Sequence, residues 1–496
     1  RLTRDQAFVY LARTVDDAVA ERVKQLAIPG VELRLEPERF LPAGALAGPI
    51  LGKVGTDNTG LSGLEAQFDE DLAGRPGAMV VERDPNGREI PGSVRRLDPA
   101  ERGDDLVLTL DRSIQHEAER SLAAAMVRHN AKGGMAIVME TSTGEVLALA
   151  NLVRPAADAA PVAAPKNMAL TDVFEPGSVN KVITISGAIE DGVVGAAEKL
   201  TVPDTIRVAD HTFSEHEPHP VARWSVTDVM ANSSNVGSIM IGQRLGKTRI
   251  DHYLRSFGFG GKTGLGFPGE SGGILLDPKK WSGTSIGTVP IGQGVAVTAM
   301  QMAAAYNAVA NGGVYVAPKL VRATVDADGK RRPTPPAARR TVVSPTTARQ
   351  VTAMLGEVVR VGTGTQAAID GYAVAGKTGT ARKPKIDARG YQEGAYVATF
   401  AGFVPAERPA LTAIVILDEP TPIFGGIVAA PVFAEVAGYA LRHLRVPPPP
   451  PSAAVAAAAV AVPDVSPASA RGVGEVGEPA ASTTTIAPSR PPQPMP

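Results

Sequence analysis

The chain has 496 residues, which is enough for two or three domains with sizeable hydrophobic cores. Its 50 basic and 51 acidic residues balance to a formal net charge of -1, and aromatic residues make up 4%. A basic nucleic-acid-binding face therefore has no support. The absence of cysteine excludes disulfides, thiol catalysis and zinc sites built on thiolates. No apolar run reaches the roughly 18 residues that span a bilayer, since residues 453–462 form the longest candidate.

The first region, residues 1–103, combines a predicted helix over residues 16–26 with strand-like pieces separated by Gly and Pro. A Gly-rich stretch follows at residues 60–74. The region shows no catalytic cluster, so we predict a non-catalytic domain. Because the chain starts at Arg1 without a methionine, we expect its beginning to be cut.

The second region, residues 104–445, has the pattern of a compact α+β domain. Asp111 can cap a helix there. Apolar residues recur after it at helical spacing: Ile114, Ala118, Leu122 and Val127. The apolar runs at residues 135–139 and 146–150 flank a turn at Thr143-Gly144, which predicts a β-hairpin.

The end of this region predicts three strands and a helix, at residues 372–380, 396–404, 411–417 and 428–443. The third region, residues 446–496, opens on consecutive prolines and continues in Ala, Pro, Ser, Thr and Val. Such a composition cannot bury enough apolar surface to fold. We therefore predict a disordered tail that acts as a linker or tether.

Ser178-Val179-Asn180-Lys181 places a hydroxyl and an amine three residues apart, which on a helix puts both side chains on one face. Pro176-Gly177 breaks the chain just before Ser178, and Gly192 offers a stop after an apolar run. Ser178 is thus predicted at a helix N-terminus, where the unpaired N–H groups favour developing negative charge. This arrangement is typical of a serine nucleophile beside its base.

Two further patterns follow in order, Ser233-Ser234-Asn235 and Lys377-Thr378-Gly379-Thr380. Both triplet types recur by chance, because Ser178-Val179-Asn180 also reads Ser-x-Asn and Lys262-Thr263-Gly264 also reads Lys-Thr-Gly. The latter follows Phe259-Gly260-Gly261, so we interpret it as a loop. The copy at Lys377 follows a strand-like run and is the one we select.

A nucleotide hydrolase is the formal rival. The segment from Gly371 to Thr378 matches the phosphate-binding G-x-x-x-x-G-K-[ST] loop, and residues 414–419 mimic the acidic strand that holds magnesium. Such a loop must open a helix. Here Gly379 and Pro384 follow, and residues 372–375 suit a strand, so we reject this interpretation.

Two other patterns fail on context. Gly283-Thr284-Ser285-Ile286-Gly287 matches the G-x-S-x-G elbow of α/β-hydrolases but lacks a strand before it and a helix after it. A group of possible zinc ligands lies within nine residues: His211, Glu215, His216 and His219. Pro218 and Pro220 prevent the helix that would align them, so we predict a solvated loop and no metal site.

The three ordered patterns resemble the serine penicillin-recognising enzymes, whose signature is S-x-x-K, S-x-N and K-T-G. Further segments resemble class B penicillin-binding proteins, particularly the FtsI-type septal transpeptidases: Glu175-Pro176-Gly177, Asn235-Val236-Gly237, Phe257-Gly258-Phe259-Gly260, Gly292-Gln293-Gly294 and Asn311-Gly312-Gly313. The likeness covers residues 5–445. It implies an α+β transpeptidase domain, an antiparallel sheet flanked by helices, behind an N-terminal pedestal domain of the dimerisation type.

The resemblance implies that Ser178 is the nucleophile, that a neutral Lys181 is its base, and that Ser233 relays a proton to the leaving group. Burial and the nearby charge of Lys377 should both lower the pKa of Lys181. Asn235 would hydrogen-bond Lys181 and the substrate peptide.

The K-T-G strand would receive the substrate's terminal carboxylate through Lys377, Thr378 and Thr380. The backbone N–H groups of Ser178 and Thr380 would form the oxyanion hole. At Gly379 we expect that a side chain would crowd a substrate laid along the strand.

The implied activity is a peptidoglycan D,D-transpeptidase that cross-links stem peptides through an acyl-enzyme and is inhibited by β-lactams. A D,D-carboxypeptidase and a silent penicillin-sensing or scaffold protein of the same fold remain alternatives. A β-lactamase is disfavoured because no Glu-x-x-Leu-Asn segment lies between Ser233 and Lys377. The resemblance also implies no cofactor, a membrane anchor ahead of Arg1, and an FtsW-type glycosyltransferase and other divisome proteins as partners.

Overall fold

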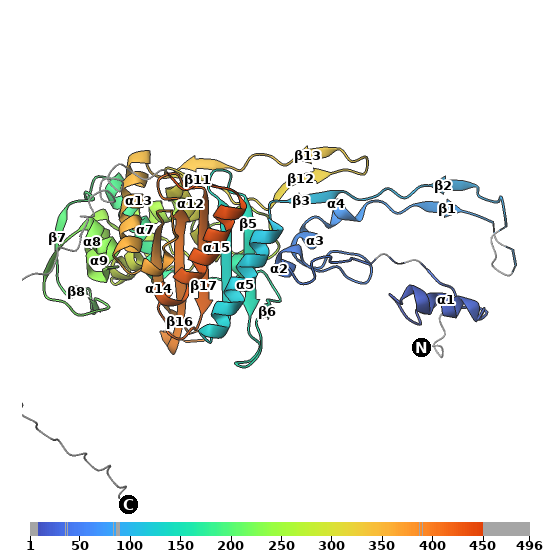
Figure 1. Ribbon diagram of the computed structural model, residues 1–496, viewed down its shortest axis with the longest axis horizontal. Helices are drawn as coiled ribbons and strands as arrows, with labels where there is room; N and C mark the ends of the chain where they lie inside the picture. The colour runs from blue at the N-terminus through green and yellow to red at the C-terminus, as the bar shows by residue number, and fades with distance from the viewer. Residues whose placement is uncertain are drawn as a thin grey trace, which may run out of the picture. The chain divides into compact units, whose positions relative to one another are not determined.

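The structure is a computed structural model that describes residues 8–449 except residues 35, 37, 83, 86–89, 386 and 389. The predicted tail lies outside the described residues beyond Pro449. A mixed helix and sheet architecture is seen (Figure 1), which confirms the predicted α+β class.

A six-stranded antiparallel sheet forms the centre of the larger domain, in the order β15-β16-β17-β4-β5-β6. Its strands are β4 (Gly133–Glu140), β5 (Val146–Val153), β6 (Val162–Ala163), β15 (Ala375–Pro384), β16 (Tyr391–Val404) and β17 (Leu411–Asp418). The predicted β4–β5 hairpin is confirmed. Strand β15 lies at the edge of the sheet, so one side of its backbone is not paired within it.

Helices cover both faces of this sheet, because its strands are apolar on both sides. Ala136 and Val138 pack toward α5 (Arg112–Arg128) and α15 (Ala430–His443), which lie side by side in Figure 1. Ile137 and Met139 pack in the opposite core. That core includes α7 (Lys181–Glu190), α12 (Ala299–Ala310) and α13 (Pro345–Arg360).

Asp111 caps α5 as predicted, because its carboxylate accepts hydrogen bonds from the N–H groups of Ser113 and Ile114. The predicted apolar stripe is wrong at Val127, which is 58% exposed in the last turn of the helix. The strand predicted at residues 372–380 begins only at Ala375, since Ile369 and Tyr372 first pair with each other in a turn.

Smaller elements complete the larger domain. Its further helices are α6 (Met168–Thr171), η1 (Gly177–Asn180), α8 (Val226–Ala231), α9 (Asn235–Leu245), α10 (Lys247–Ser256), η2 (Pro278–Lys280), α11 (Ser285–Thr288), η3 (Val289–Ile291), η4 (Thr365–Ala367) and α14 (Gly425–Val428). Two-stranded sheets pair β7 (Lys199–Val202) with β10 (Ala222–Ser225), β8 (Thr205–Val208) with β9 (His211–Ser214), and β11 (Val314–Val316) with β14 (Arg339–Thr341).

The N-terminal region is small and largely exposed. It contains α1 (Asp17–Gln25), α2 (Gly48–Leu51), α3 (Gly63–Gln67), α4 (Asp69–Ala73), β1 (Ala78–Val80) and β2 (Arg96–Asp98). The predicted helix over residues 16–26 is confirmed as α1. Strands β1 and β2 pair with each other and bury almost nothing, whereas Ile50 and Leu64 join the core of the larger domain.

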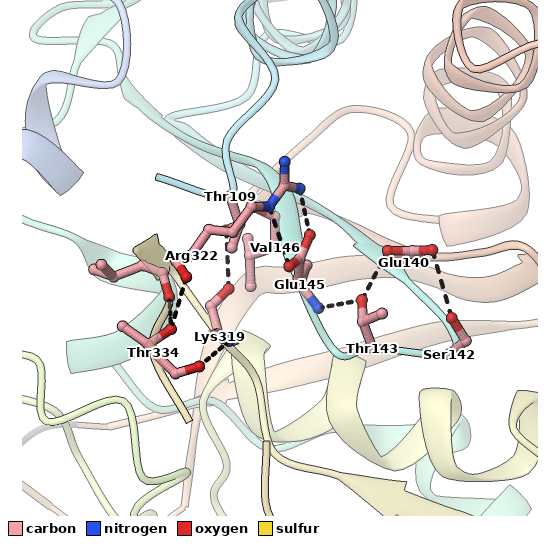
Figure 2. Close-up of polar contacts among 10 residues, drawn as sticks. Thr109, Glu140, Ser142, Thr143, Glu145, Val146, Lys319, Arg322 and Thr334 are labelled. Carbon is pink, nitrogen blue, oxygen red and sulfur yellow. Dashed lines mark hydrogen bonds and ion pairs between the residues drawn. The ribbon is translucent and has the colours of Figure 1, made fainter. Parts of the chain in front are cut away.

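The chain passes from one region to the other through β3 (Asp105–Leu108), which pairs with β12 (Val321–Val325), itself paired with β13 (Arg331–Pro333). Figure 2 shows how polar side chains fix this junction. The Thr109 hydroxyl donates to the carbonyl oxygens of Val146 (2.7 Å) and Lys319 (2.9 Å), and Arg322 pairs with Glu145. Three segments distant in sequence are thereby held together.

Candidate active site

Ser178 lies in the short 3-10 turn η1, which runs directly into α7. Pro176 and Gly177 start the turn, and Gly177 adopts a left-handed φ of +57°. In a 3-10 turn, residues three apart are eclipsed, so Ser178 and Lys181 project to one side. The predicted helix start is confirmed, with the refinement that its first turn is tighter than an α-helix.

The turn is held by segments more than 100 residues away. Tyr306 of α12 donates its hydroxyl to the Val179 carbonyl (3.0 Å), and the Asn180 side chain donates to the Val289 carbonyl (2.9 Å). At Gly292, a Cβ would lie 2.2 Å from the Gly177 carbonyl oxygen, so only glycine fits there. Two of the flanking segments in the sequence thus shape the nucleophile's turn.

Glu175 extends this support. Its carboxylate accepts from the N–H of Gly294 (2.8 Å) and from the hydroxyl of Tyr391 in β16 (2.9 Å). Burial raises its pKa, with the two hydrogen bonds opposing the shift. Glu175, which directly precedes Pro176, therefore connects the start of the turn to Gly294 and to strand β16.

Lys181 is fully buried and directs its amine at the second motif. Lys181 Nζ lies 2.5 Å from the Ser233 carbonyl oxygen, 2.7 Å from Asn235 Oδ1 and 3.4 Å from Ser233 Oγ. Among the described residues, no hydrogen bond joins Lys181 Nζ to Ser178 Oγ. The amine of Lys181 therefore faces the Ser233 motif rather than the hydroxyl of Ser178.

Burial lowers the pKa of Lys181 to about 7, although the charge of Glu215 opposes the shift. A substantial fraction of the amine is then neutral at physiological pH, as a proton acceptor requires. Burial also lowers the pKa of Lys377, which is fully buried too, and the charge of Lys181 adds to that shift. The expected repulsion between the two amines is present, but it acts on Lys377.

Ser233 adopts a left-handed backbone with φ of +57°, which a non-glycine residue rarely occupies. It stands between α8 and α9. The N–H of Ser234 donates back to the Val229 carbonyl (2.9 Å), while the Ser234 hydroxyl caps α9 through the N–H of Gly237 (2.8 Å). This bend turns both oxygens of Ser233 toward Lys181.

Glu215 is the site residue that the sequence did not reveal. Its carboxylate accepts from the Ser234 hydroxyl and from the N–H groups of Asn235 (2.7 Å) and Val236 (3.0 Å). The preceding Ser214 carbonyl accepts from Asn235 Nδ2 at 3.2 Å. The solvated-loop prediction is thus wrong for Glu215, which clamps the N-terminus of α9. This contact of Glu215 with the second motif is visible only in the structure, because the two segments are separated in the sequence.

The other members of the histidine-rich segment make ring contacts, His211 with Phe213, His216 with Phe424 and His219 with Trp224. No group of three potential metal-ligating side chains is found in the part of the chain that the structure describes.

The third motif lies on the edge strand β15, beside η1. Lys377 pairs in register with Ala401 of β16, and its Nζ lies 3.2 Å from the Thr378 carbonyl oxygen. The Thr378 hydroxyl contacts that of Thr363 at 2.6 Å, and Thr380 Oγ1 accepts from the Gly425 N–H at 3.4 Å. The strand, rather than a helix start, carries Lys377 and Thr378, which removes the phosphate-loop rival.

Gly379 has a steric constraint within the protein itself. A Cβ at Gly379 would lie 3.1 Å from Val179 Cγ1 and 3.3 Å from the Pro176 carbonyl oxygen. The absent side chain thus allows β15 to lie close to the turn that carries Ser178. From the other side, a Cβ at Gly177 would lie 3.1 Å from the Ala381 Cβ and 3.6 Å from the Thr380 carbonyl oxygen, so the turn and the strand are in direct contact.

The two remaining motif matches, the second Lys-Thr-Gly and the G-x-S-x-G segment, lie in a loop and at a short helix. Lys262-Thr263-Gly264 lies in a loop, as predicted, and Thr263 donates its N–H to Glu270 (2.7 Å). Ser285 opens the four-residue helix α11 after η2, with no strand before it. The hydrolase elbow is therefore absent at that position.

Comparison with known proteins agrees with this geometry. Residues 134–438 match the model of the penicillin binding protein transpeptidase domain, and residues 3–108 match that of the penicillin-binding protein dimerisation domain. Penicillin-binding protein PbpB of Mycolicibacterium smegmatis is 39% identical over 463 residues, covering 90% of this chain and 71% of that protein. Peptidoglycan D,D-transpeptidase FtsI of Escherichia coli is 34% identical over 454 residues, covering 89% and 73%.

Solved structures give the same result. Penicillin binding protein 3 of Mycobacterium tuberculosis, in complex with aztreonam, superposes with a TM-score of 0.75 at 36% identity and covers 84% of this chain and 92% of that one. The expected two-domain architecture is therefore confirmed. The chain belongs to the class B penicillin-binding proteins of the FtsI type.

Proposed function

We propose that this protein is a peptidoglycan D,D-transpeptidase that cross-links stem peptides during cell division. The observation that carries the proposal is the position of Lys181. Lys181 directly follows the turn of Ser178, is fully buried, and has its pKa lowered to about 7, and its amine contacts oxygens of Ser233 and Asn235. A neutral lysine in that position is a base for a serine nucleophile.

In the acylation step, Ser178 Oγ attacks the carbonyl carbon of the D-alanyl-D-alanine bond while Lys181 Nζ accepts its proton. As the C–N bond breaks, the proton passes through Ser233 Oγ to the departing D-alanine amine. Ser178 then holds an ester. The amine of a second stem peptide attacks this ester, its proton follows the reverse path to Ser178, and an amide cross-link is released.

The edge strand receives the donor peptide in this scheme. Lys377, Thr378 and Thr380 bind its terminal carboxylate, and Asn235 contacts the peptide as well as Lys181. The N–H groups of Ser178 and Thr380 stabilise the oxyanion, a contribution typically of about 10² to 10³ in rate for each donor. Support comes from the unpaired edge of β15 and its contact with η1.

β-Lactams acylate the same serine in this proposal, because their strained amide occupies the position of the D-alanyl-D-alanine bond. The similar penicillin binding protein 3 of Mycobacterium tuberculosis has been solved with aztreonam and with ampicillin. Peptidoglycan and β-lactams are thus the ligands of the site, and it needs no cofactor or metal.

The wider setting is proposed from the family. We assign residues 1–103 to the pedestal, 104–445 to the transpeptidase domain and 446–496 to a tail. The domain would lie outside the cytoplasmic membrane behind a single anchor ahead of Arg1, with an FtsW-type glycosyltransferase and other divisome proteins as partners. Within the described residues, no helix has the length and apolar character needed to cross a bilayer.

Intact-mass measurement after exposure to benzylpenicillin tests the assignment. The wild type should gain the whole mass of the drug, because ring opening releases no fragment, and Ser178→Ala should gain nothing. Ser282→Ala, at an exposed serine outside the site, is the matched control and should label like the wild type. A stable adduct on Ser178→Ala, or none on the wild type, contradicts the proposal.

A further inference from the structure

A cavity of about 600 Å³ lies at the junction of the two regions, away from Ser178. Leu64, Gln67 and Phe68 of the N-terminal region contribute to its wall. The opposite wall includes the glycine-rich loop 258–265 and the segment 334–338. We call it the junction cavity. Gln67 Nε2 donates to the Leu265 carbonyl at 2.8 Å, so the two walls are directly connected.

The charge of the junction cavity is one-sided. Four basic side chains line it, Arg255, Lys262, Lys319 and Arg340, and no Asp or Glu is among the described residues that form its wall. The chain as a whole is balanced at a formal charge of -1. A concave site with only positive side chains concentrates anions.

The cations lie next to one another along the loop. Arg255 Nη1 would be 3.2 Å from a Cβ at Gly260, and the ring of Tyr315 would be 2.9 Å from a Cβ at Gly258. The guanidinium of Arg340 in turn stacks 3.7 Å from the centroid of the Tyr315 ring. This chain of contacts places both guanidinium groups against the same short loop.

The four basic side chains use only part of their hydrogen-bonding capacity within the protein. Arg340 Nε donates to the Ser256 carbonyl (3.0 Å), and its guanidinium also hydrogen-bonds the Tyr315 side chain. Arg255 Nε forms an ion pair with Asp251 at 2.9 Å, and its terminal nitrogens have no hydrogen-bond acceptor among the described residues. Lys319 Nζ donates to the carbonyls of Thr334 (3.4 Å) and Pro335 (3.2 Å), the first of which Figure 2 shows. Lys262 is exposed and unpaired within the described part of the chain.

The loop adds backbone donors. The N–H groups of Gly260, Gly261, Lys262 and Gly264 have no acceptor among the described residues. Gly260 and Gly264 adopt left-handed φ values of +75° and +92°. Glu270 lies next to the loop, since Thr263 donates both its N–H and its hydroxyl to this carboxylate.

We propose that the junction cavity binds a phosphate or diphosphate ester. Guanidinium groups and the N–H groups of the loop are donors of the kind that bind a tetrahedral oxyanion. The volume exceeds that of a bare phosphate, and Leu64, Phe68 and Leu265 supply apolar wall for the organic part of the ester. Lys262-Thr263-Gly264, which takes no part at the active site, is the centre of this second site. Because both regions line the cavity, the ligand stabilises their junction.

Calorimetric titration with inorganic diphosphate at fixed ionic strength tests the binding. The wild type should bind saturably. Arg340→Gln should raise Kd about tenfold and the exposed Lys262→Gln about threefold, since a charged hydrogen bond is replaced by a neutral one. Lys199→Gln, an equal charge change on exposed β7, should leave Kd unchanged.

Acylation of each variant by benzylpenicillin verifies the fold and should match the wild type. A failure of the ligand site is therefore separate from a failure of the proposed enzymatic function. Sedimentation with phosphatidylcholine vesicles, with and without phosphatidic acid, distinguishes the source. Binding to diphosphate alone assigns a soluble ester, and retention by phosphatidic acid assigns a lipid headgroup. The absence of both, or equal losses in Arg340→Gln and Lys199→Gln, overturns the proposal.

Discussion

The chain contains Lys-Thr-Gly twice, and the two copies have opposite surroundings. Lys377 is fully buried on the edge strand β15, beside the turn that carries Ser178. Lys262 is exposed in a glycine-rich loop. Burial and the charge of Lys181 lower the pKa of Lys377. The comparison teaches that burial and the neighbouring backbone, not the triplet, determine the chemistry.

The largest difference between the two copies is expected when Lys377 and Lys262 are each replaced. Lys377→Met should lower the rate of acylation by benzylpenicillin about 10² to 10³-fold, because the carboxylate loses its anchor beside the oxyanion hole. Lys262→Met should leave the rate within twofold of the wild type. Stopped-flow acylation measures both. Equal effects of the two changes would show that the burial of Lys377 has no catalytic meaning.

The pH dependence of the acylation rate gives a second test, because it depends on the buried Lys181 and not on the exposed Lys262. Lys181 must be neutral to accept the Ser178 proton, and its pKa is lowered to about 7. Acylation should therefore rise with pH and level off above about 7, with a loss of about tenfold per pH unit below that value. The Lys262→Met variant should give the same profile. A limb near pH 10, the ordinary range for lysine, would contradict the assignment of Lys181 as the base.

The two glycines of the triplets give the third test. Gly379→Ala should destabilise the protein by about 1 to 3 kcal/mol and slow acylation, because the new Cβ presses on Val179 and on the Pro176 carbonyl. Gly264→Ala meets no atom within 4 Å, but its φ is +92°. It should cost about 1 kcal/mol through backbone strain alone and leave acylation unchanged. Urea unfolding and stopped-flow acylation separate the two outcomes.

The smallest effect is expected at the two glutamates behind the motifs. Glu215→Gln removes the charge that raises the pKa of Lys181, so the acidic limb of acylation should move to lower pH. It also replaces charged hydrogen bonds at Asn235 and Val236 by neutral ones, which should cost about 1 kcal/mol. Glu270→Gln, behind Thr263, is the matched control and should not move the limb. A common shift in both variants would exclude a specific role for Glu215.

Sequence alone located the turn of Ser178 and the strand of Lys377 because their signals are local. Pro176-Gly177 predicted the start of the turn, and a strand-like run followed by Gly379 and Pro384 predicted Lys377 on a strand rather than at a helix start. The Asp111 cap and the β4–β5 hairpin are local signals as well. These elements are also those that the structure confirms.

The missed features depend on contacts between distant segments. Glu215 reads as one acid among histidines and prolines, and its partners lie about 20 residues further along the chain. The pairing of β3 with β12 joins residues more than 200 positions apart, and no sequence motif predicts it. The packing of Gly379 against Val179 is likewise visible only in three dimensions.

The supports of the Ser178 turn have a consequence for how the protein folds. Val179 accepts a hydrogen bond from Tyr306, 127 residues later, and Glu175 accepts one from Tyr391, 216 residues later. Contacts of such separation close large loops and form slowly. During synthesis, the nucleophile therefore emerges long before the segments that give it its shape. Covalent labelling by a penicillin should accordingly report the last stages of folding, and a chain released before residue 391 should remain unlabelled.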